Sequence, residues 1–204
     1  MMKRIVCFGD SNTYGYIPAR GGRYDSTARW TGLLRTMLPH CEIVEEGLNG
    51  RTTVFDDKNI PGRNGSRALE IVLRDNDPAD VILIMLGTND CKCRFHTDAG
   101  MIANGMEILV SQIRLFDPNT RIVIIAPACL TEESTADGSF DQHSLQTAAE
   151  LRDSYRRLAL RTGCGFIPAC DSIVPDSADG VHLSPEGHRR LARLVYDYLT
   201  DPQK

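Results

Sequence analysis

Short runs of apolar residues alternate along the chain with longer stretches in which apolar residues recur every three or four positions. A run that is apolar throughout predicts a strand buried on both faces. A recurrence of three or four predicts a helix with one apolar face. On this basis we expect strands at residues 4–8, 42–45, 81–86, 122–126 and 165–167, and helices at residues 29–38, 66–74, 97–116, 145–161 and from 185 onward. Residues 12–25, which contain three glycines and a proline, are expected to form a loop.

The order of these elements predicts the fold class. Strands and helices alternate along the whole chain, which is typical of an α/β layer fold with a parallel sheet and right-handed crossovers. Residues 42–45 alternate polar and apolar side chains, so this strand is expected nearer an edge of the sheet. Because there is no internal repeat and no low-complexity linker, residues 1–204 are expected to form a single domain.

Composition and charge exclude several classes of protein. A net charge of -4 leaves no basic footprint for nucleic acid, and the scattered lysines and arginines argue against an anionic membrane surface. No apolar run approaches the length of a membrane span, so no membrane insertion is expected. The four apolar residues before Gly9 are too few for a signal-peptide core. With seven cysteines, an odd number, reduced thiols and a cytoplasmic location are expected.

Four polar segments carry the candidate chemistry. Three of them follow predicted strands, and ligands of parallel sheets bind beyond the carboxyl ends of the strands. The fold rule therefore brings these three to one edge of the sheet, while the fourth precedes the last helix. The segments are Gly9-Asp10-Ser11-Asn12, Asn49-Gly50, Gly87-Thr88-Asn89-Asp90 and Asp179-Gly180-Val181-His182.

Ser11, His182 and Asp179 have the residue types of a nucleophile, a base and an orienting carboxylate. A serine hydroxyl is a poor nucleophile at neutral pH and needs a base, and the base needs a group that fixes its tautomer. The three-residue separation of Asp179 and His182 lets one turn hold both. Taken alone, Ser11 could simply be a turn residue, and Asp179 and His182 could simply be a surface ion pair. Their joint occurrence favours a serine hydrolase.

Attack on an ester carbonyl places negative charge on its oxygen, and fixed hydrogen-bond donors stabilise that charge. One such donor contributes about 3–4 kcal/mol in other enzymes. The candidate donors are the backbone N–H of Ser11, the backbone N–H of Gly50 and the side-chain amide of Asn89. Together they would form an oxyanion hole.

The four segments resemble the four sequence blocks of the SGNH (GDSL-type) hydrolases, in order and with suitable spacing over nearly the whole chain. Residues 46–53 and 85–90 look closest to the bacterial arylesterase/acyltransferase subgroup, although some members there carry alanine where this chain has Gly50. The resemblance implies that Ser11 is the nucleophile, that Asp179 and His182 complete the triad, and that Gly50 and Asn89 complete the oxyanion hole.

The same resemblance implies a flavodoxin-like three-layer α/β/α sandwich with about five parallel strands in the order 2-1-3-4-5. It also implies that the protein needs no metal and no organic cofactor. Relatives in the arylesterase group often oligomerise, so a homo-oligomer stays open. Substrate-binding residues cannot be assigned from the sequence, but the loops at residues 55–65 and 130–141 are expected to set substrate choice.

We therefore expect a serine-dependent carboxylic-ester hydrolase of the arylesterase or acetylesterase type. It would act on small acyl groups of a small-molecule ester through an acyl-serine intermediate. Three alternatives use the same scaffold and chemistry: a thioesterase, a lysophospholipase or a carbohydrate deacetylase. A non-catalytic flavodoxin-like binding module is disfavoured, because neither glycine-rich phosphate-loop pattern is present.

A few other residues could be taken for functional ones, but structural roles explain them better. Cys91-Lys92-Cys93 is C-x-C without a second pair, which argues against a zinc site but leaves these residues at the mouth of the pocket. His188 is expected to be solvated on the last helix. Asp10 is expected to shape the turn at the nucleophile and to take no part in proton transfer, and Trp30 is expected in the core.

Overall fold

Five parallel strands form the central layer in the order β2-β1-β3-β4-β5, which is the order that the family resemblance implies. The computed structural model describes residues 2–202. Each predicted strand is present, and the alternating strand β2 lies at an edge. The strands are β1 (Lys3–Gly9), β2 (Cys41–Gly47), β3 (Val81–Met85), β4 (Arg121–Ala126) and β5 (Gly165–Pro168).

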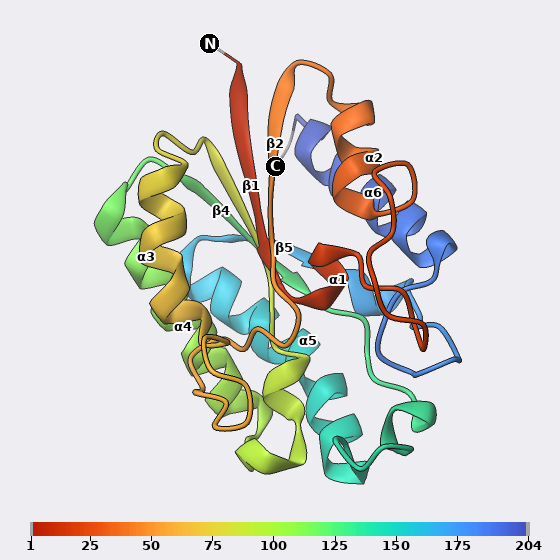
Figure 1. The fold of residues 1–204 in the computed structure, drawn as a ribbon. Helices are drawn as coiled ribbons and strands as arrows, with labels where there is room; N and C mark the ends of the chain where they lie inside the picture. Colours follow the sequence, from red (N-terminus) through yellow and green to blue (C-terminus); the bar gives the residue numbers. More distant parts are fainter. Residues whose placement is uncertain (1, 203–204) are drawn as a thin grey trace.

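Helices cover both faces of the sheet, which gives three layers (Figure 1). One face carries α2 (Trp30–Met37) and α6 (Pro185–Thr200), which lie side by side. The other carries α3 (Gly65–Asp75), α4 (Ala99–Phe116) and α5 (Gln142–Thr162). These are the five helices expected from the sequence, each within a few residues of its predicted bounds.

Alternation along β1 explains why the middle strands are apolar throughout. Successive side chains of a strand point to opposite faces of the sheet. Val6 and Phe8 pack with α3, α4 and α5, whereas Ile5 and Cys7 pack with α2 and α6. A polar side chain on either face of its buried part would lie away from water, so residues 5–8 are all apolar, and the two charged residues of β1, Lys3 and Arg4, lie at its less buried start.

Short elements at the carboxyl edge were not predicted. Residues 12–25 were expected as loop, but α1 (Ser11–Tyr14) begins directly after β1. Gly9 permits this tight turn, because a Cβ there would lie 2.1 Å from Thr13 Oγ1 and 2.9 Å from the Met85 carbonyl oxygen. The remaining short elements are the 3-10 turns η1 (Asn89–Cys91), η2 (Cys93–Phe95), η3 (Glu132–Thr135) and η4 (Ala169–Asp171).

The last helix begins as its sequence predicts. Ser184 Oγ accepts a hydrogen bond from the Gly187 N–H at 3.1 Å, and Pro185 takes the first helical position. This start directs the preceding residues, 179–183, to the carboxyl edge of the sheet. None of the helices within residues 2–202 combines the length and apolar character that a membrane crossing requires.

Candidate active site

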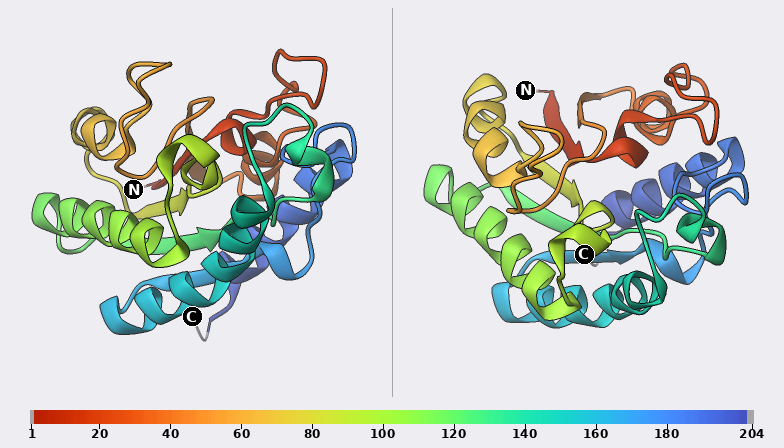
Figure 2. Two further views of the ribbon diagram at one scale, coloured as in Figure 1. Left: turned by 90° about the horizontal axis from the view of Figure 1, so that it is seen from below. Right: turned by 60° about the horizontal axis from the view of Figure 1, so that its bottom comes forward.

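The segments at the carboxyl ends of the strands gather around one cavity of about 510 Å³. Figure 2 views this end of the molecule, where the segments that follow the strands lie close together. All five predicted site residues line the cavity, although they come from four separate stretches of the chain. They are Ser11, Gly50, Asn89, Asp179 and His182.

Ser11, His182 and Asp179 form a continuous chain of hydrogen bonds. His182 Nε2 lies 2.9 Å from Ser11 Oγ, and His182 Nδ1 lies 2.7 Å from Asp179 Oδ2. A proton on Nδ1 held by the carboxylate leaves Nε2 free to accept the serine proton. The arrangement is that of a nucleophile, a base and a group that orients the base.

The surroundings of Asp179 keep its carboxylate ionised. Partial burial opposes ionisation, but hydrogen bonds from the His182 ring and from two backbone N–H groups outweigh it and lower the pKa of Asp179 to about 2. The backbone donors are Val181 at 3.0 Å and His182 at 2.9 Å, both bonded to Asp179 Oδ1. At neutral pH this carboxylate is therefore a fixed negative charge behind the imidazole.

Asn12 connects the nucleophile turn to the 179–183 loop. Its amide Nδ2 donates to the Val181 carbonyl at 3.1 Å, and its Oδ1 accepts from the Leu183 N–H at 2.9 Å. Asp10 caps the turn by accepting the Asn12 N–H at 3.0 Å, as the sequence suggested. Sequence reasoning missed Asn12, because nothing local indicates partners about 170 positions away.

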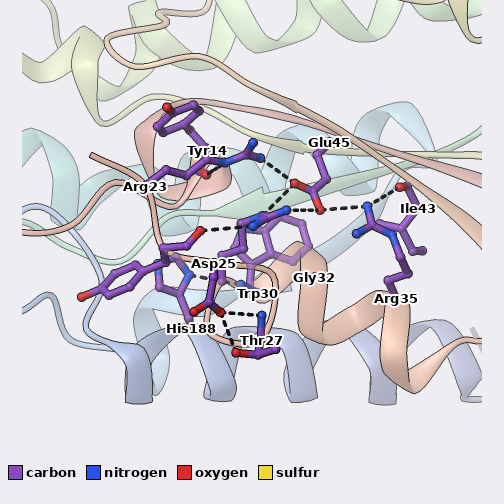
Figure 3. Close-up of polar contacts among 12 residues, drawn as sticks. Tyr14, Arg23, Asp25, Thr27, Trp30, Gly32, Arg35, Ile43, Glu45 and His188 are labelled. Carbon is purple, nitrogen blue, oxygen red and sulfur yellow. Dashed lines mark hydrogen bonds and ion pairs between the residues drawn. The ribbon is translucent and has the colours of Figure 1, made fainter. Parts of the chain in front are cut away.

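Tyr16 is a second residue that sequence reasoning missed. Its ring packs on the His182 imidazole with the ring centroids 4.4 Å apart, and it lines the cavity. The loop that carries Tyr16 is held by Glu45 of β2, which pairs with Arg23 at 2.5 Å and with Arg29 at 2.8 Å. Figure 3 shows Glu45 among its arginine partners, with Arg35 bound from the other side.

The candidate oxyanion donors occupy two neighbouring turns. Gly50 has a φ of 77°, a backbone conformation that favours glycine. The Asn89 amide Nδ2 donates to the Arg51 carbonyl at 3.2 Å, which fixes its orientation and leaves its second N–H for the cavity. The Arg51 guanidinium is buried and donates to the Gly9 and Glu46 carbonyls, so it ties the turn after β2 to the end of β1.

The buried carboxylate of Asp90 binds the segment that follows Gly50. Its Oδ1 accepts the Thr53 backbone N–H at 2.9 Å and the Thr53 hydroxyl. Burial raises the pKa of Asp90 to about 6, and burial likewise raises the pKa of Asp10 to about 6. These two acids hold backbone groups in place and do not line the cavity.

The loops expected to set substrate choice do line the cavity. Residues 55–65 contribute Ile60 and Arg63, and the 130–141 loop forms much of the opposite wall, including Phe140. Lys92 also lines the cavity, in agreement with the place expected for residues 91–93. Among residues 2–202, no cluster of three His, Cys, Asp or Glu side chains is arranged to hold a metal.

His188 differs from the sequence expectation, because it is fully buried. Its Nδ1 accepts the Trp30 N–H at 3.3 Å, and burial lowers its pKa to about 4. Trp30 is buried, as expected. His188 shares one helix face with Leu191 and Val195, and this spacing could have placed it against α2.

Comparison with protein families finds one match. The model of the GDSL-like lipase/acylhydrolase family matches residues 7–190, which include every predicted site residue. No curated protein sequence matches the chain.

Solved structures of similar shape include esterases. A carbohydrate acetylesterase from Sinorhizobium meliloti is 36% identical, with a TM-score of 0.91 over 97% of this chain and 98% of that one. A carbohydrate acetylesterase family member from the same organism is 35% identical, with a TM-score of 0.92 over 97% of both chains. The native aryl esterase of M. smegmatis is 32% identical, with a TM-score of 0.91 over 97% of this chain and 98% of that one.

Proposed function

Since the chain belongs to the GDSL-like lipase/acylhydrolase family and is a hydrolase that acts on esters, we propose that it cleaves carboxylic esters of small acyl groups through an acyl-serine intermediate. The observation that carries this proposal is the contact of 2.9 Å between Ser11 Oγ and His182 Nε2, with Asp179 2.7 Å behind the imidazole. Apo sites often hold such groups more loosely, so this one is already arranged for proton transfer.

Acylation begins when Ser11 Oγ bonds to the ester carbonyl carbon and its proton passes to His182 Nε2. The carbonyl π electrons move onto oxygen and give a tetrahedral oxyanion. When this intermediate collapses, the bond to the alcohol oxygen breaks, and the proton on Nε2 passes to the leaving alcohol. Ionised Asp179 stabilises the imidazolium that exists between these two transfers.

The oxyanion is assigned to the N–H groups of Ser11 and Gly50 and to the free N–H of the Asn89 amide. Deacylation repeats the sequence with water as the nucleophile: His182 takes a proton from water, the new oxyanion collapses, and the proton returns to Ser11 Oγ. The products are the carboxylic acid and the regenerated enzyme.

Replacing Ser11 by alanine tests the proposal. Release of p-nitrophenol from p-nitrophenyl acetate should fall by about 10⁴-fold or more, because no other group can form the acyl-enzyme. Ser111→Ala, on an exposed part of α4, is the matched control and should keep full activity. A fluorophosphonate probe should label the wild type and not Ser11→Ala. Full activity of a correctly folded Ser11→Ala variant would contradict the proposal.

Removal of acetyl groups from carbohydrates is the second candidate, and the polar wall of the cavity favours it. Glu133, Ser134, Asp137 and Ser139 face the cavity from the 130–141 loop and are able to bond to sugar hydroxyls. A panel of acetylated sugars and aryl acetates distinguishes the two. A higher kcat/KM for the acetylated sugars would favour the deacetylase. Preference for long-chain acyl groups would favour the lysophospholipase or thioesterase alternatives instead.

A further inference from the structure

Two cationic side chains line the cavity without an ion-pair partner. Arg63 and Lys92 both face it, and neither lies within 4.0 Å of a carboxylate among the residues that the structure describes. Their neighbours in sequence behave differently: Arg67 pairs with Asp56 at 2.7 Å, and Arg94 pairs with Asp57 at 2.7 Å. Of these four side chains, the two without an ion pair are the ones that face the cavity.

Arg63 lies beside the oxyanion donors. A Cβ built on Gly50 would be 3.5 Å from both Cδ and Nε of Arg63, so the guanidinium packs directly on this glycine. Arg63 Nε is shielded from solvent and, within residues 2–202, has no hydrogen-bond partner. A guanidinium that loses part of its hydration without gaining an acceptor destabilises the folded protein. A bound anion would offset this unfavourable free energy.

Lys92 lies beside Asn89, because its backbone N–H donates to the Asn89 carbonyl at 3.3 Å, and its side chain lines the cavity. Its Nζ is 5.9 Å from the centre of the Phe140 ring, and burial lowers the pKa of Lys92. Besides Asp137 at the cavity rim, two acids influence Lys92, and both are engaged elsewhere. Asp57 is held by Arg94, and Asp10 is buried and caps α1.

Besides Asp179, which is bonded to His182, the acids of the cavity lie at its exposed rim. Glu133 accepts the Thr131 hydroxyl and Asp137 accepts the Ser139 N–H, so each is held within its own loop. Both are exposed to solvent, which screens their charge. The cavity therefore presents positive charge next to the oxyanion donors, while its negative charges are Asp179, which is bonded to His182, and the two acids at its mouth.

We propose that the substrate is an ester bearing a negatively charged group, a carboxylate or a phosphate, which Arg63 and Lys92 bind. This proposal rests on the proposed esterase function and names the substrate class of that same site. Arg63 supplies a planar fork that matches a carboxylate or phosphate, and Lys92 supplies a point charge. Because Arg63 packs on Gly50 and Lys92 is bonded to the Asn89 backbone, the anionic group would lie near the reacting carbonyl.

Matched ester pairs test the proposal with the wild-type enzyme. The first pair, para-acetoxybenzoate and its methyl ester, places the charge on the alcohol side of the bond. The second, the para-nitrophenyl esters of hemisuccinate and of pentanoate, places it on the acyl side. In one pair, kcat/KM should be at least about tenfold higher for the anionic member than for the neutral one, and raised salt should reduce that ratio. Phosphate-bearing acetates, compared with their neutral methyl phosphotriesters, distinguish phosphate from carboxylate.

Variants connect the preference to the two side chains. Arg63→Gln and Lys92→Met should each lower the ratio of kcat/KM for the anionic over the neutral ester by about tenfold. Methionine keeps the apolar stem that packs near Phe140, and Lys92→Arg should restore the ratio. Arg67→Gln, next to the same loop but paired with Asp56, is the matched control and should leave the ratio unchanged.

Three results would overturn the proposal: neutral members preferred in every pair, a ratio that does not respond to salt, or variants that slow both members of a pair equally. The last would mean that Lys92 and Arg63 serve the fold alone. If Arg63→Gln does not fold, the Lys92→Met variant and the salt dependence of the wild-type ratio still test the proposal. Hydrolysis of the neutral esters without an anionic preference would leave the esterase proposal intact, whereas inactivity on all esters would contradict the esterase proposal itself.

Discussion

The two walls of the cavity are built differently. The inner wall, defined as Ser11, Gly50, Asn89, Asp179 and His182, is buried or half-buried, and hydrogen bonds hold its four side chains in place. The outer wall, defined as Ile60, Glu133, Ala136, Asp137 and Ala178, is exposed. This contrast fits the proposed function: we propose that the chemistry, which needs fixed geometry, is carried by the inner wall, and that the exposed loops contribute to substrate choice.

The largest expected effect is on the inner wall, at Asp179. In Asp179→Asn the amide cannot stabilise the imidazolium and can favour the wrong tautomer of His182, so kcat on p-nitrophenyl acetate should fall by about 10⁴-fold. Steady-state kinetics and far-UV circular dichroism check this. Asp137→Asn, on the outer wall, is the matched control. A loss below about tenfold would show that the inner wall does not depend on this carboxylate.

Beneath the inner wall, His188 should give the protein a pH-dependent stability. Its pKa is lowered from 6.5 to about 4 by burial, so between these values the unfolded chain binds a proton that the folded protein does not. Stability is therefore lost as the pH falls from about 6.5 to 4. Over this interval the free energy of unfolding should fall less in His188→Gln than in wild type, by up to about 3 kcal/mol.

Urea unfolding at pH 7 and at pH 4.5 measures the His188 effect, because it gives the free energy of unfolding at each pH. His40→Gln is the control, since His40 is exposed and should leave the pH dependence as it is in wild type. Equal losses in wild type and His188→Gln would mean that His188 is protonated in the folded protein.

A smaller effect is expected at Asn12, which positions the inner wall without touching substrate. Asn12→Ala removes two hydrogen bonds to the 179–183 loop. The loss should raise the activation free energy by about 1–2 kcal/mol, which lowers kcat about tenfold. The rate of fluorophosphonate labelling should fall in parallel, which a purely structural role would not produce. Asn119→Ala is the control at the far end of the molecule. A lower melting temperature with an unchanged rate of fluorophosphonate labelling would contradict the positioning role of Asn12.

The smallest effect is expected on the outer wall, at Ile60. It is 41% exposed, so Ile60→Ala should change the free energy of unfolding by less than about 0.5 kcal/mol. Turnover of p-nitrophenyl acetate should stay within about twofold, while the preference among longer acyl chains shifts. An equal loss for all chain lengths would place Ile60 with the inner wall and break the distinction between the two walls.

The sequence by itself determined the layers of the fold. The apolar run of β3 can only be a strand covered on both faces, and the capping serine before α6 marks where that helix begins. Local signals of this kind need no knowledge of distant residues. Ser11, Asn89 and His182 could also be found from sequence, because the fold rule brings strand ends to one edge and the family blocks mark the positions.

Tertiary structure alone decided what surrounds those residues. Ser11 meets His182 across 171 positions, Asn12 bonds to the same loop, and Tyr16 packs on the imidazole from a segment expected to be plain loop. Burial also made His188 a neutral core residue and left Arg63 unpaired beside Gly50. Sequence periodicity reports which face of an element is apolar, but not which partner covers it, and hydrogen bonding, burial and charge pairing all depend on that partner.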